Sequence, residues 1–345
     1  MEAQRKRKGS NVIFIHKHHL CLHDLKMYNQ DLKNIYLVKT NVPEYPRPEF
    51  HVSDLRHDTQ QGGLLRIWKD EGFKDPHGGL KDPDSLSLVW WSLVVGPQEI
   101  QSAETRLLDK FYPNRMEKQA EKKPSYLDEI YPDRNKQESF LWKFATSPAF
   151  GEKSRFGSYR FTFPLKDVVT AYSQQFCSGA PPIMRVFKTS LYKQEVQYSV
   201  LIHSPAREKL FSEYPLLAYD DPNAVCTYRD GHFIWRSQAM CETHSWKLIQ
   251  KPDKNRMDAK SLYSHEHQFY VWDNVAVALH VDHGQVLKFD CDRLRANLTY
   301  CEKPTENVPA GIHYDSFENA KSLVGHLWPD AGFPLEKEPS LNLIF

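Results

Sequence analysis

The sequence predicts an α+β protein with mixed, mostly antiparallel β-sheets and a few flanking helices. Runs rich in β-branched and aromatic residues dominate the chain from residue 155 onward, as expected of strands. Only a few segments place apolar residues at helical spacing. Strands and helices do not alternate regularly, as they would in a chain of βαβ units, and no internal repeat of fixed period is present.

The first half of the chain is expected to hold a short strand, a helix, a buried strand and a second helix. Residues 50–53 are typical of a strand end that carries His51, and a short helix follows, stopping at Gly72 in a left-handed cap. The polar stretch around His57 favours a loop. Residues 86–95 predict a buried strand, and residues 98–112 predict a helix that ends before Pro113.

The second half is expected to be richer in strands. Residues 159–163 predict a strand and residues 165–176 a helix. Two paired strands are expected over 184–191 and 195–202. Asp230 and Gly231 predict the turn of a hairpin over 225–236. A further strand-rich stretch covers 269–281, followed by a turn at 282–284.

The composition indicates a globular protein that lies inside the cell. Of 345 residues, 40% are hydrophobic and 13% aromatic, which is enough for a large core. We expect a flexible basic tail over 1–10 and a single domain over 11–345, with a surface insertion or soft boundary at 113–138. No apolar run reaches the length of a membrane span, and no secretion signal is expected, so we predict a cytoplasmic or nuclear protein without a membrane partner.

The net charge and the spacing of the cysteines argue against several further classes of protein. The formal net charge is +1, which argues against a surface that coats nucleic acid. Six cysteines are widely spaced and none forms a C-x-x-C pair, so neither a zinc ribbon nor a disulfide framework is expected. Cys177 and Cys241 are interpreted as buried thiols.

One stretch resembles the start of a known enzyme fold. The strand end with His51 and Ser53 matches an H-x-[ST] spacing, and residues 65–73 provide a helix followed by Gly and Phe. This order is similar to the nicotinamide-clamping start of the ADP-ribosyltransferase fold, in particular its PARP-like members. A second H-x-T candidate begins at His57. The G-x-Y-F pattern of that family is absent, and Met240 stands where a paired E-x-E would have its first Glu.

The resemblance implies an ADP-ribosyltransferase-like protein, either an ADP-ribosyltransferase or an NAD glycohydrolase, with NAD as its substrate and no metal. It implies that His51 holds the NAD ribose or the nicotinamide amide and that Ser53 assists. Tyr159 or Tyr172 would stack on nicotinamide. Glu242 would orient the ribose and stabilise positive charge as nicotinamide leaves. The acceptor would be a protein, a nucleic acid or water.

Structural interpretations of the same residues stay open from the sequence. His51 is alternatively a polar strand-end residue with a backbone partner. Glu242 is equally half of a buried ion pair with Arg155, Arg160 or Arg236.

The alternative function is a non-catalytic interaction module. Aromatic and basic residues alternate around Arg160 and from Arg185 to Lys188, and such strands bind proteins or single-stranded RNA through stacking and phosphate contacts. Pairs of histidines such as His265 and His267 are interpreted as surface residues, because no established ligand spacing occurs.

Overall fold

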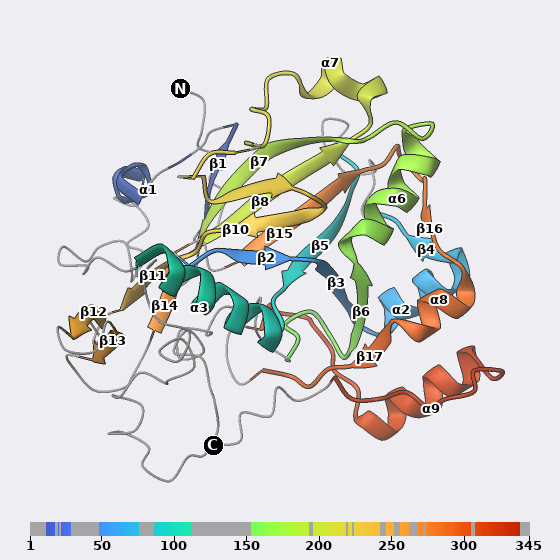
Figure 1. The fold of residues 1–345 in the computed structure, drawn as a ribbon. Coiled ribbons are helices and arrows are strands. Elements are labelled where there is room, and N and C mark those ends of the chain that lie inside the picture. The colour runs from blue at the N-terminus through green and yellow to red at the C-terminus, as the bar shows by residue number, and fades with distance from the viewer. Residues whose placement is uncertain are drawn as a thin grey trace, which may run out of the picture.

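The computed structural model describes residues 12–17, 20, 22–28, 48–75, 86–111, 153–192, 196–218, 220–222, 224–241, 246–251, 256–261, 268–271, 274–304 and 308–338. Its centre is an eight-stranded sheet in the order β1-β7-β8-β15-β5-β3-β6-β17 (Figure 1). In that order the strands are Val12–His16, Ile183–Tyr192, Val196–His203, Asn274–His280, Leu88–Val94, Asp54–Thr59, Tyr159–Pro164 and Leu298–Tyr300. Among the described strands of this sheet only β8 and β15 pair in parallel, so the chain is an α+β protein with mostly antiparallel sheets, as predicted.

A second sheet follows the first closely in the chain, because its strand β2 leads into β3 of the large sheet. It has the order β2-β10-β9, with β2 at Phe50–Val52, β10 at His232–Trp235 and β9 at Cys226–Arg229. Ser53 alone separates β2 from β3, and its carbonyl accepts a hydrogen bond from the Leu165 backbone N–H at 2.7 Å. Residues 50–59 therefore run from the small sheet directly into the large one (Figure 1).

Three further strand pairs complete the described β-structure. They are β11 (Gln238–Cys241) with β14 (Gln268–Val271), β12 (Trp246–Lys251) with β13 (Arg256–Ser261), and β16 (Leu287–Lys288) with β4 (Gly72–Phe73).

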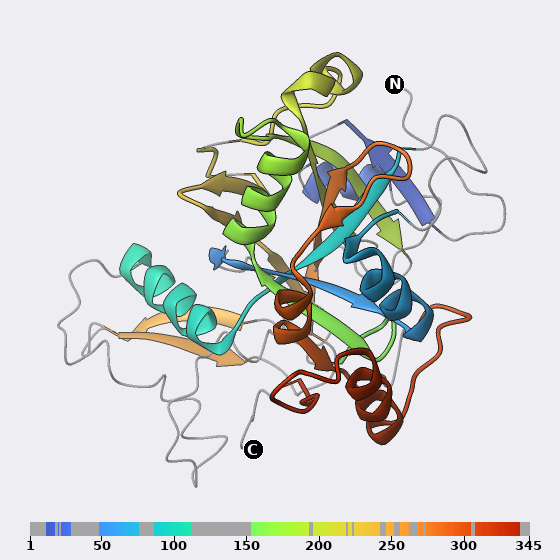
Figure 2. The ribbon, with the colours of Figure 1, turned by 90° about the vertical axis from the view of Figure 1, so that its right-hand side faces the viewer.

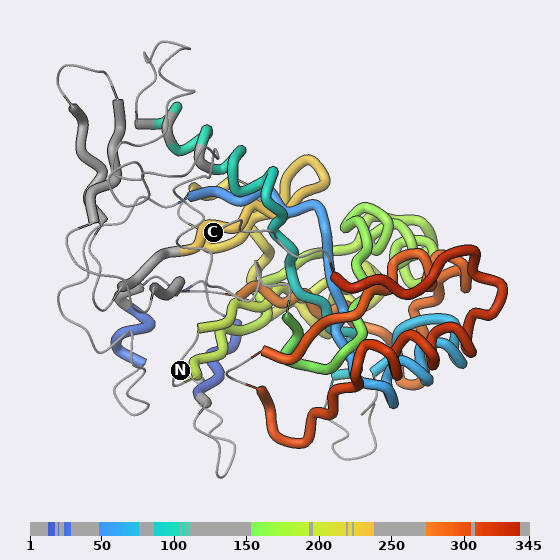
Figure 3. The backbone as a smooth tube through the Cα atoms, turned by 90° about the horizontal axis from the view of Figure 1, so that it is seen from below, coloured from blue at the N-terminus to red at the C-terminus, as the bar shows by residue number. Residues whose placement is uncertain are grey.

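Four helices gather at one side of the main sheet. These are α2 (Gln61–Asp70), α6 (Leu165–Phe176), α8 (Cys291–Ala296) and α9 (Phe317–Leu327), as Figure 2 shows. Helix α2 lies beside α9 (Figure 3), and the Trp68 indole N–H donates to the Leu327 carbonyl at 2.9 Å. Helix α3 (Pro97–Phe111) contacts β2, while α1 (Leu22–Tyr28), η4 (Pro205–Arg207) and α7 (Glu208–Phe211) are short.

The core is aromatic where the helices meet the sheet. Phe73, Trp91, Phe163 and Phe289 are buried and form a continuous group of ring contacts, with centroids 4.6 to 6.2 Å apart. Such edge-to-face and tilted pairs add to the stabilisation that comes from burying their area. This packing joins β4, β5, β6 and the segment after β16 next to β3, the strand that carries His57.

Several local predictions are confirmed. The predicted helix over 165–176 is α6, and the predicted strand pair over 184–202 is the antiparallel pair β7–β8. The hairpin β9–β10 turns at Asp230 and Gly231, whose φ angles of 52° and 81° suit a tight turn of the kind that Asp-Gly favours. The expectations for residues 1–10 and 113–138 lie outside the described residues.

Two local predictions are wrong. The left-handed cap of α2 is Glu71 (φ 52°, ψ 42°), whereas Gly72 begins β4. Gly72 is needed for another reason, because a Cβ there would lie 2.2 Å from the Leu287 carbonyl oxygen. The stretch around His57, predicted as a loop, is strand β3. Its polar side chains are tolerated in a central strand because Asp58 and Arg56 pair with charges on that face.

No helix in the described ranges combines the length and the apolar character that crossing a membrane requires.

Candidate functional site

The consecutive strands β2 and β3 each carry one histidine, and the two histidines lie in different sheets. His51 is opposite Ile234 in the small sheet, and His57 is opposite Phe161 in the large one. The sequence resemblance assigns the NAD-holding role to His51 and leaves His57 as a second candidate. The surroundings of the two rings distinguish them.

His51 lies in a group of ion pairs around α3. Its backbone N–H donates to the Glu99 carboxylate at 2.5 Å, and Glu99 also binds Arg106. Arg106 donates to the Glu49 carbonyl at 2.6 Å, and the Glu49 carboxylate accepts from Arg236 at 2.6 Å. These contacts fix the His51 backbone next to α3.

The His51 imidazole is held neutral. Burial and the nearby Arg106 charge lower its pKa, although Glu49 opposes them. The ring Nε2 is buried without a hydrogen-bond partner in the described part of the chain. Burial raises the pKa of Glu99 against the opposing effects of the His51 N–H and Arg106. These groups support one another in position, and the role of His51 toward NAD stays a prediction.

The other residues predicted for the site do not gather around His51. Ser53 is exposed, and its hydroxyl donates to Asp54 at 2.9 Å. Tyr159 and Tyr172 are fully buried, with their hydroxyls donating to the Asp315 carboxylate at 2.7 Å and the His280 carbonyl at 2.5 Å. Burial raises the pKa of both phenols, so they stay protonated. Neither ring presents an open face for stacking, and Glu242 lies outside the described residues.

His57 lies against the aromatic core and is half-buried. Its Nδ1 is 2.8 Å from the Trp90 carbonyl oxygen. Because a carbonyl only accepts, Nδ1 carries the proton, and Nε2 of the neutral ring is left as an acceptor. The ring contacts Phe73 and Trp91 with centroids 5.0 and 5.6 Å away. Burial lowers the pKa of His57 more than the Trp90 bond and Asp58 raise it.

The turn that follows His57 is tightly constrained. Thr59 ends β3, and α2 begins two residues later. A Cβ on Gly63 would lie 1.9 Å from the Thr59 hydroxyl oxygen, and one on Gly157 would lie 2.4 Å from the Thr59 carbonyl oxygen. Only glycine fits at these two contacts, so Thr59 is held in place from both sides. Since side chains two apart on a strand share a face, His57 and Thr59 point the same way.

The opposite face of β3 is charged. Asp58 accepts from Arg160 at 2.8 Å, and Arg56 lies 4.0 Å from the same carboxylate. Glu338 lies 3.4 Å from Arg160 on the other side. Burial alone would raise the pKa of Asp58, but the charges of Arg160 and Arg56 outweigh it and lower the pKa to about 2. These buried ion pairs link β3 to β6.

Two arginines of the aromatic-basic strands lie in the interior. Arg160 and Arg185 are 1% and 4% exposed and therefore lie inside. Arg185 pairs with Glu208 and donates to the His203 ring at 2.9 Å. Neither guanidinium is available to stack on RNA bases or to bind its phosphates. Arg160 and Arg236 pair with Asp58 and Glu49, so both have carboxylate partners other than Glu242.

Metal and thiol chemistry have limited support. Within the described ranges, no group of three or more His, Cys, Asp or Glu residues is placed to hold a metal ion, and His265 and His267 lie outside those ranges. Cys177 is buried, and burial raises the pKa of its thiol, which agrees with an inert buried cysteine.

Comparison of this chain with protein-family models, with curated proteins and with solved structures finds no significant match.

His57 belongs to strand β3, whereas the sequence indicated a loop. His57 and Thr59 have the H-x-T spacing and stand closer to the helix and to Gly72 than His51 does. The polar residues around them concealed the strand.

Proposed function

We propose that this protein is an ADP-ribosyltransferase-like NAD-binding protein in which His57, rather than His51, holds the dinucleotide. The observation that carries the proposal is the order of elements around His57. An H-x-T pair ends a central strand, α2 follows directly, and Phe73 of β4 returns to pack on the histidine ring at 5.0 Å. This is the order that the sequence resemblance requires of a nicotinamide clamp.

The chemistry of the pair suits a ribose. The neutral His57 ring offers Nε2 as an acceptor, and the Thr59 hydroxyl both donates and accepts. The vicinal hydroxyls of a ribose need such a combination of groups. The Trp90 carbonyl fixes the tautomer, and Gly63 and Gly157 fix the position of Thr59, so little conformational freedom is left to lose on binding.

Cleavage would break the bond between nicotinamide and the ribose carbon. Neutral nicotinamide would leave with the bonding electrons, and water or an acceptor nucleophile would add to the same carbon and lose a proton. Glu242 is the carboxylate that the resemblance assigns to stabilising the positive charge on the ribose. The Thr59–His57 pair would hold the ribose and would not itself form a bond to it.

Binding is tested by calorimetric titration of NAD into the wild-type protein and two matched variants. His57→Asn keeps an amide N–H near the position of Nδ1, for the Trp90 carbonyl, and deletes Nε2. His51→Asn makes the same change six residues away. We expect His57→Asn to weaken binding at least about tenfold, the effect of losing one good hydrogen bond, and His51→Asn to leave it within about twofold.

Cleavage is tested separately by following nicotinamide release, with Glu242→Gln as the comparison. Release that disappears in Glu242→Gln while NAD binding persists supports an NAD-cleaving enzyme. Binding without release supports an NAD-binding protein. Absence of saturable binding to the folded wild-type protein contradicts the proposal.

A further inference from the structure

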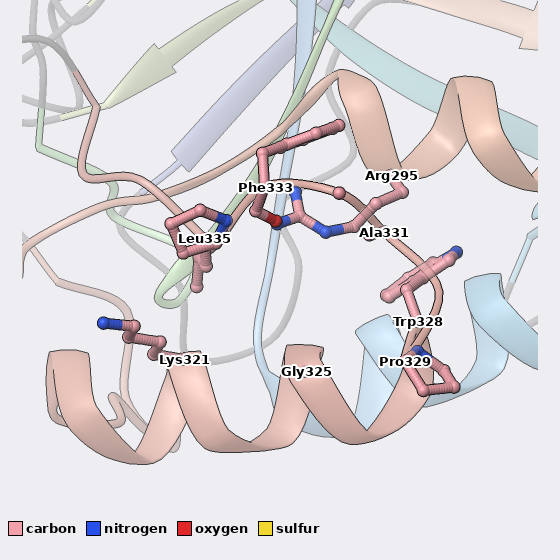
Figure 4. A pocket seen from close by; sticks show the side chains of 10 residues that line it. Arg295, Lys321, Gly325, Trp328, Pro329, Ala331, Phe333 and Leu335 are labelled. Carbon is pink, nitrogen blue, oxygen red and sulfur yellow. The ribbon is translucent and has the colours of Figure 1, made fainter.

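A separate pocket lies on the outer side of the helical layer, between α9 and the segment 328–335. Its volume is about 290 Å³. Figure 4 shows Arg295 of α8 reaching into it, with Lys321 and Gly325 on the α9 side and Trp328, Phe333 and Leu335 around the rest. The size is near the lower end of small-molecule pockets, about 300–1,000 Å³, so a dinucleotide does not fit.

Arg295 is an unusual cation for this protein. Five arginines are buried among the described residues, and four of them lie within 4.0 Å of a carboxylate. Arg295, only 3% exposed, has no such ion pair in the described part of the chain. Burying a charge without a close counter-ion is costly, because the lost hydration is only partly replaced by hydrogen bonds and more distant charges. An unpaired buried guanidinium in a cavity indicates that an anion belongs there.

The local geometry leaves much of the guanidinium available. One nitrogen donates to the Phe333 carbonyl at 2.9 Å, and the Phe333 ring covers one side with its centroid 4.6 Å away. A guanidinium has five N–H donors in a planar fork, which matches the two oxygens of a carboxylate. Burial lowers the pKa of Arg295, and the more distant Glu336 carboxylate opposes this change. Lys321 is exposed on the same pocket and supplies a second positive charge.

The rest of the lining is apolar or open. Phe333 is 47% exposed although it is large and aromatic, and Trp328 and Leu335 provide further apolar surface. A Cβ added to Gly325 would meet nothing within 4 Å, so the surface of α9 at Gly325 is open space. A ligand here needs one negative end and a small flat apolar body.

We propose that this pocket binds a small organic acid, specifically a carboxylate attached to a flat ring of aryl or heteroaryl type. The carboxylate lies on the Arg295 fork with Lys321 beside it, and the ring lies over Gly325 against Leu335 and Trp328. The inference does not rest on the NAD proposal, because the pocket shares no residue with the His57 region.

The test uses benzoate as the probe, benzamide as its neutral isostere and inorganic phosphate as a simple anion, each titrated by ligand-observed NMR. We expect saturable benzoate binding, with benzamide at least about tenfold weaker because it lacks the charge. Equal affinity for benzoate and benzamide, or phosphate binding as strong as benzoate binding, overturns the assignment. So does the absence of saturable benzoate binding.

Three variants locate the binding without removing the buried arginine. Gly325→Leu places a good helix former in the open space and should abolish binding while the fold is kept. Lys321→Gln should weaken binding several-fold, and Lys166→Gln, an exposed lysine of α6, should not change it. Thermal unfolding of each variant checks the fold. Benzoate binding that is unchanged in folded Gly325→Leu places the probe elsewhere and overturns the proposal.

Discussion

Asp58 and Arg160 lie directly opposite each other on β3 and β6 and form a two-bond ion pair, with Nε–Oδ1 at 2.8 Å and Nη2–Oδ2 at 3.0 Å. A shift of one residue along a strand moves each side chain to the other face. The pair therefore fixes the register that turns Asp58 to the charged face and His57 to the aromatic face. The position of the candidate NAD residue depends on this buried contact.

Removing the Asp58 charge should destabilise the protein strongly. Asp58→Asn removes the negative charge that balances Arg160 and Arg56 in the interior. We expect this to lower the free energy of unfolding by about 3 kcal/mol. Urea denaturation measures it. Asp220→Asn is the control, because its 3.4 Å pair with Arg229 is exposed and should contribute less than about 0.5 kcal/mol. Equal effects of the two substitutions would contradict the account.

The same carboxylate predicts an acid-dependent loss of stability. The pKa of Asp58 is lowered to about 2 in the folded protein, against about 3.9 in an unfolded chain. A lowered pKa stabilises the folded state above the unfolded value, and that contribution disappears as pH falls from about 4 toward 2. The loss is on the order of 2 kcal/mol. Between pH 5 and pH 2 the free energy of unfolding should therefore decrease by about 2 kcal/mol less in Asp58→Asn than in the wild type.

Two neighbouring glycines of α2 should respond in opposite ways to alanine. At Gly62 an added Cβ meets nothing within 4 Å, so Gly62→Ala should stabilise the helix by roughly 0.5–1 kcal/mol. At Gly63 the added Cβ meets the Thr59 hydroxyl, and the stiff threonine side chain must move, so we expect about 1–3 kcal/mol of destabilisation. Thermal unfolding compares them, and a stabilised Gly63→Ala variant contradicts the described turn.

The His57 tautomer is directly measurable. Nitrogen-detected NMR of the imidazoles should show His57 protonated at Nδ1 near neutral pH, because the Trp90 carbonyl accepts that proton. Burial lowers its pKa, so the ring should charge below the usual value of about 6.5. A His57 that titrates above that value, or that carries its proton on Nε2, would rule out the acceptor role assigned to it.

Local sequence patterns predicted several turns, helices and strands of the fold. Asp230 and Gly231 marked their hairpin because few other residue pairs accept two positive φ angles in succession. Helix α6 was predicted with its observed bounds, since Pro164 precedes it and its apolar spacing is regular. The sheet order was not foretold. β15 enters between β8 and β5, and no short-range signal specifies pairing between strands so distant in the sequence.

The site was harder to predict than the fold. Arg160 and Arg185 look like outward-facing cations in the sequence, because a single strand does not reveal the carboxylate that it will meet. His57 looks like a loop residue for the same reason, since its polar neighbours Arg56 and Asp58 find partners only in the folded sheet. Arg295 has no signal in the sequence, because its burial without a close carboxylate among the described residues is a property of the folded protein.

The most direct test of the central claim is the imidazole NMR spectrum during titration with a carba-NAD analogue that resists cleavage. We predict that the His57 Nε2 and Cε1–H signals shift saturably with the analogue, while the corresponding signals of His51 stay unchanged. Saturable shifts of the His51 signals alone would mean that His51 in the small sheet, and not His57, contacts the dinucleotide. No shift of either ring at saturating analogue would contradict NAD binding at this strand.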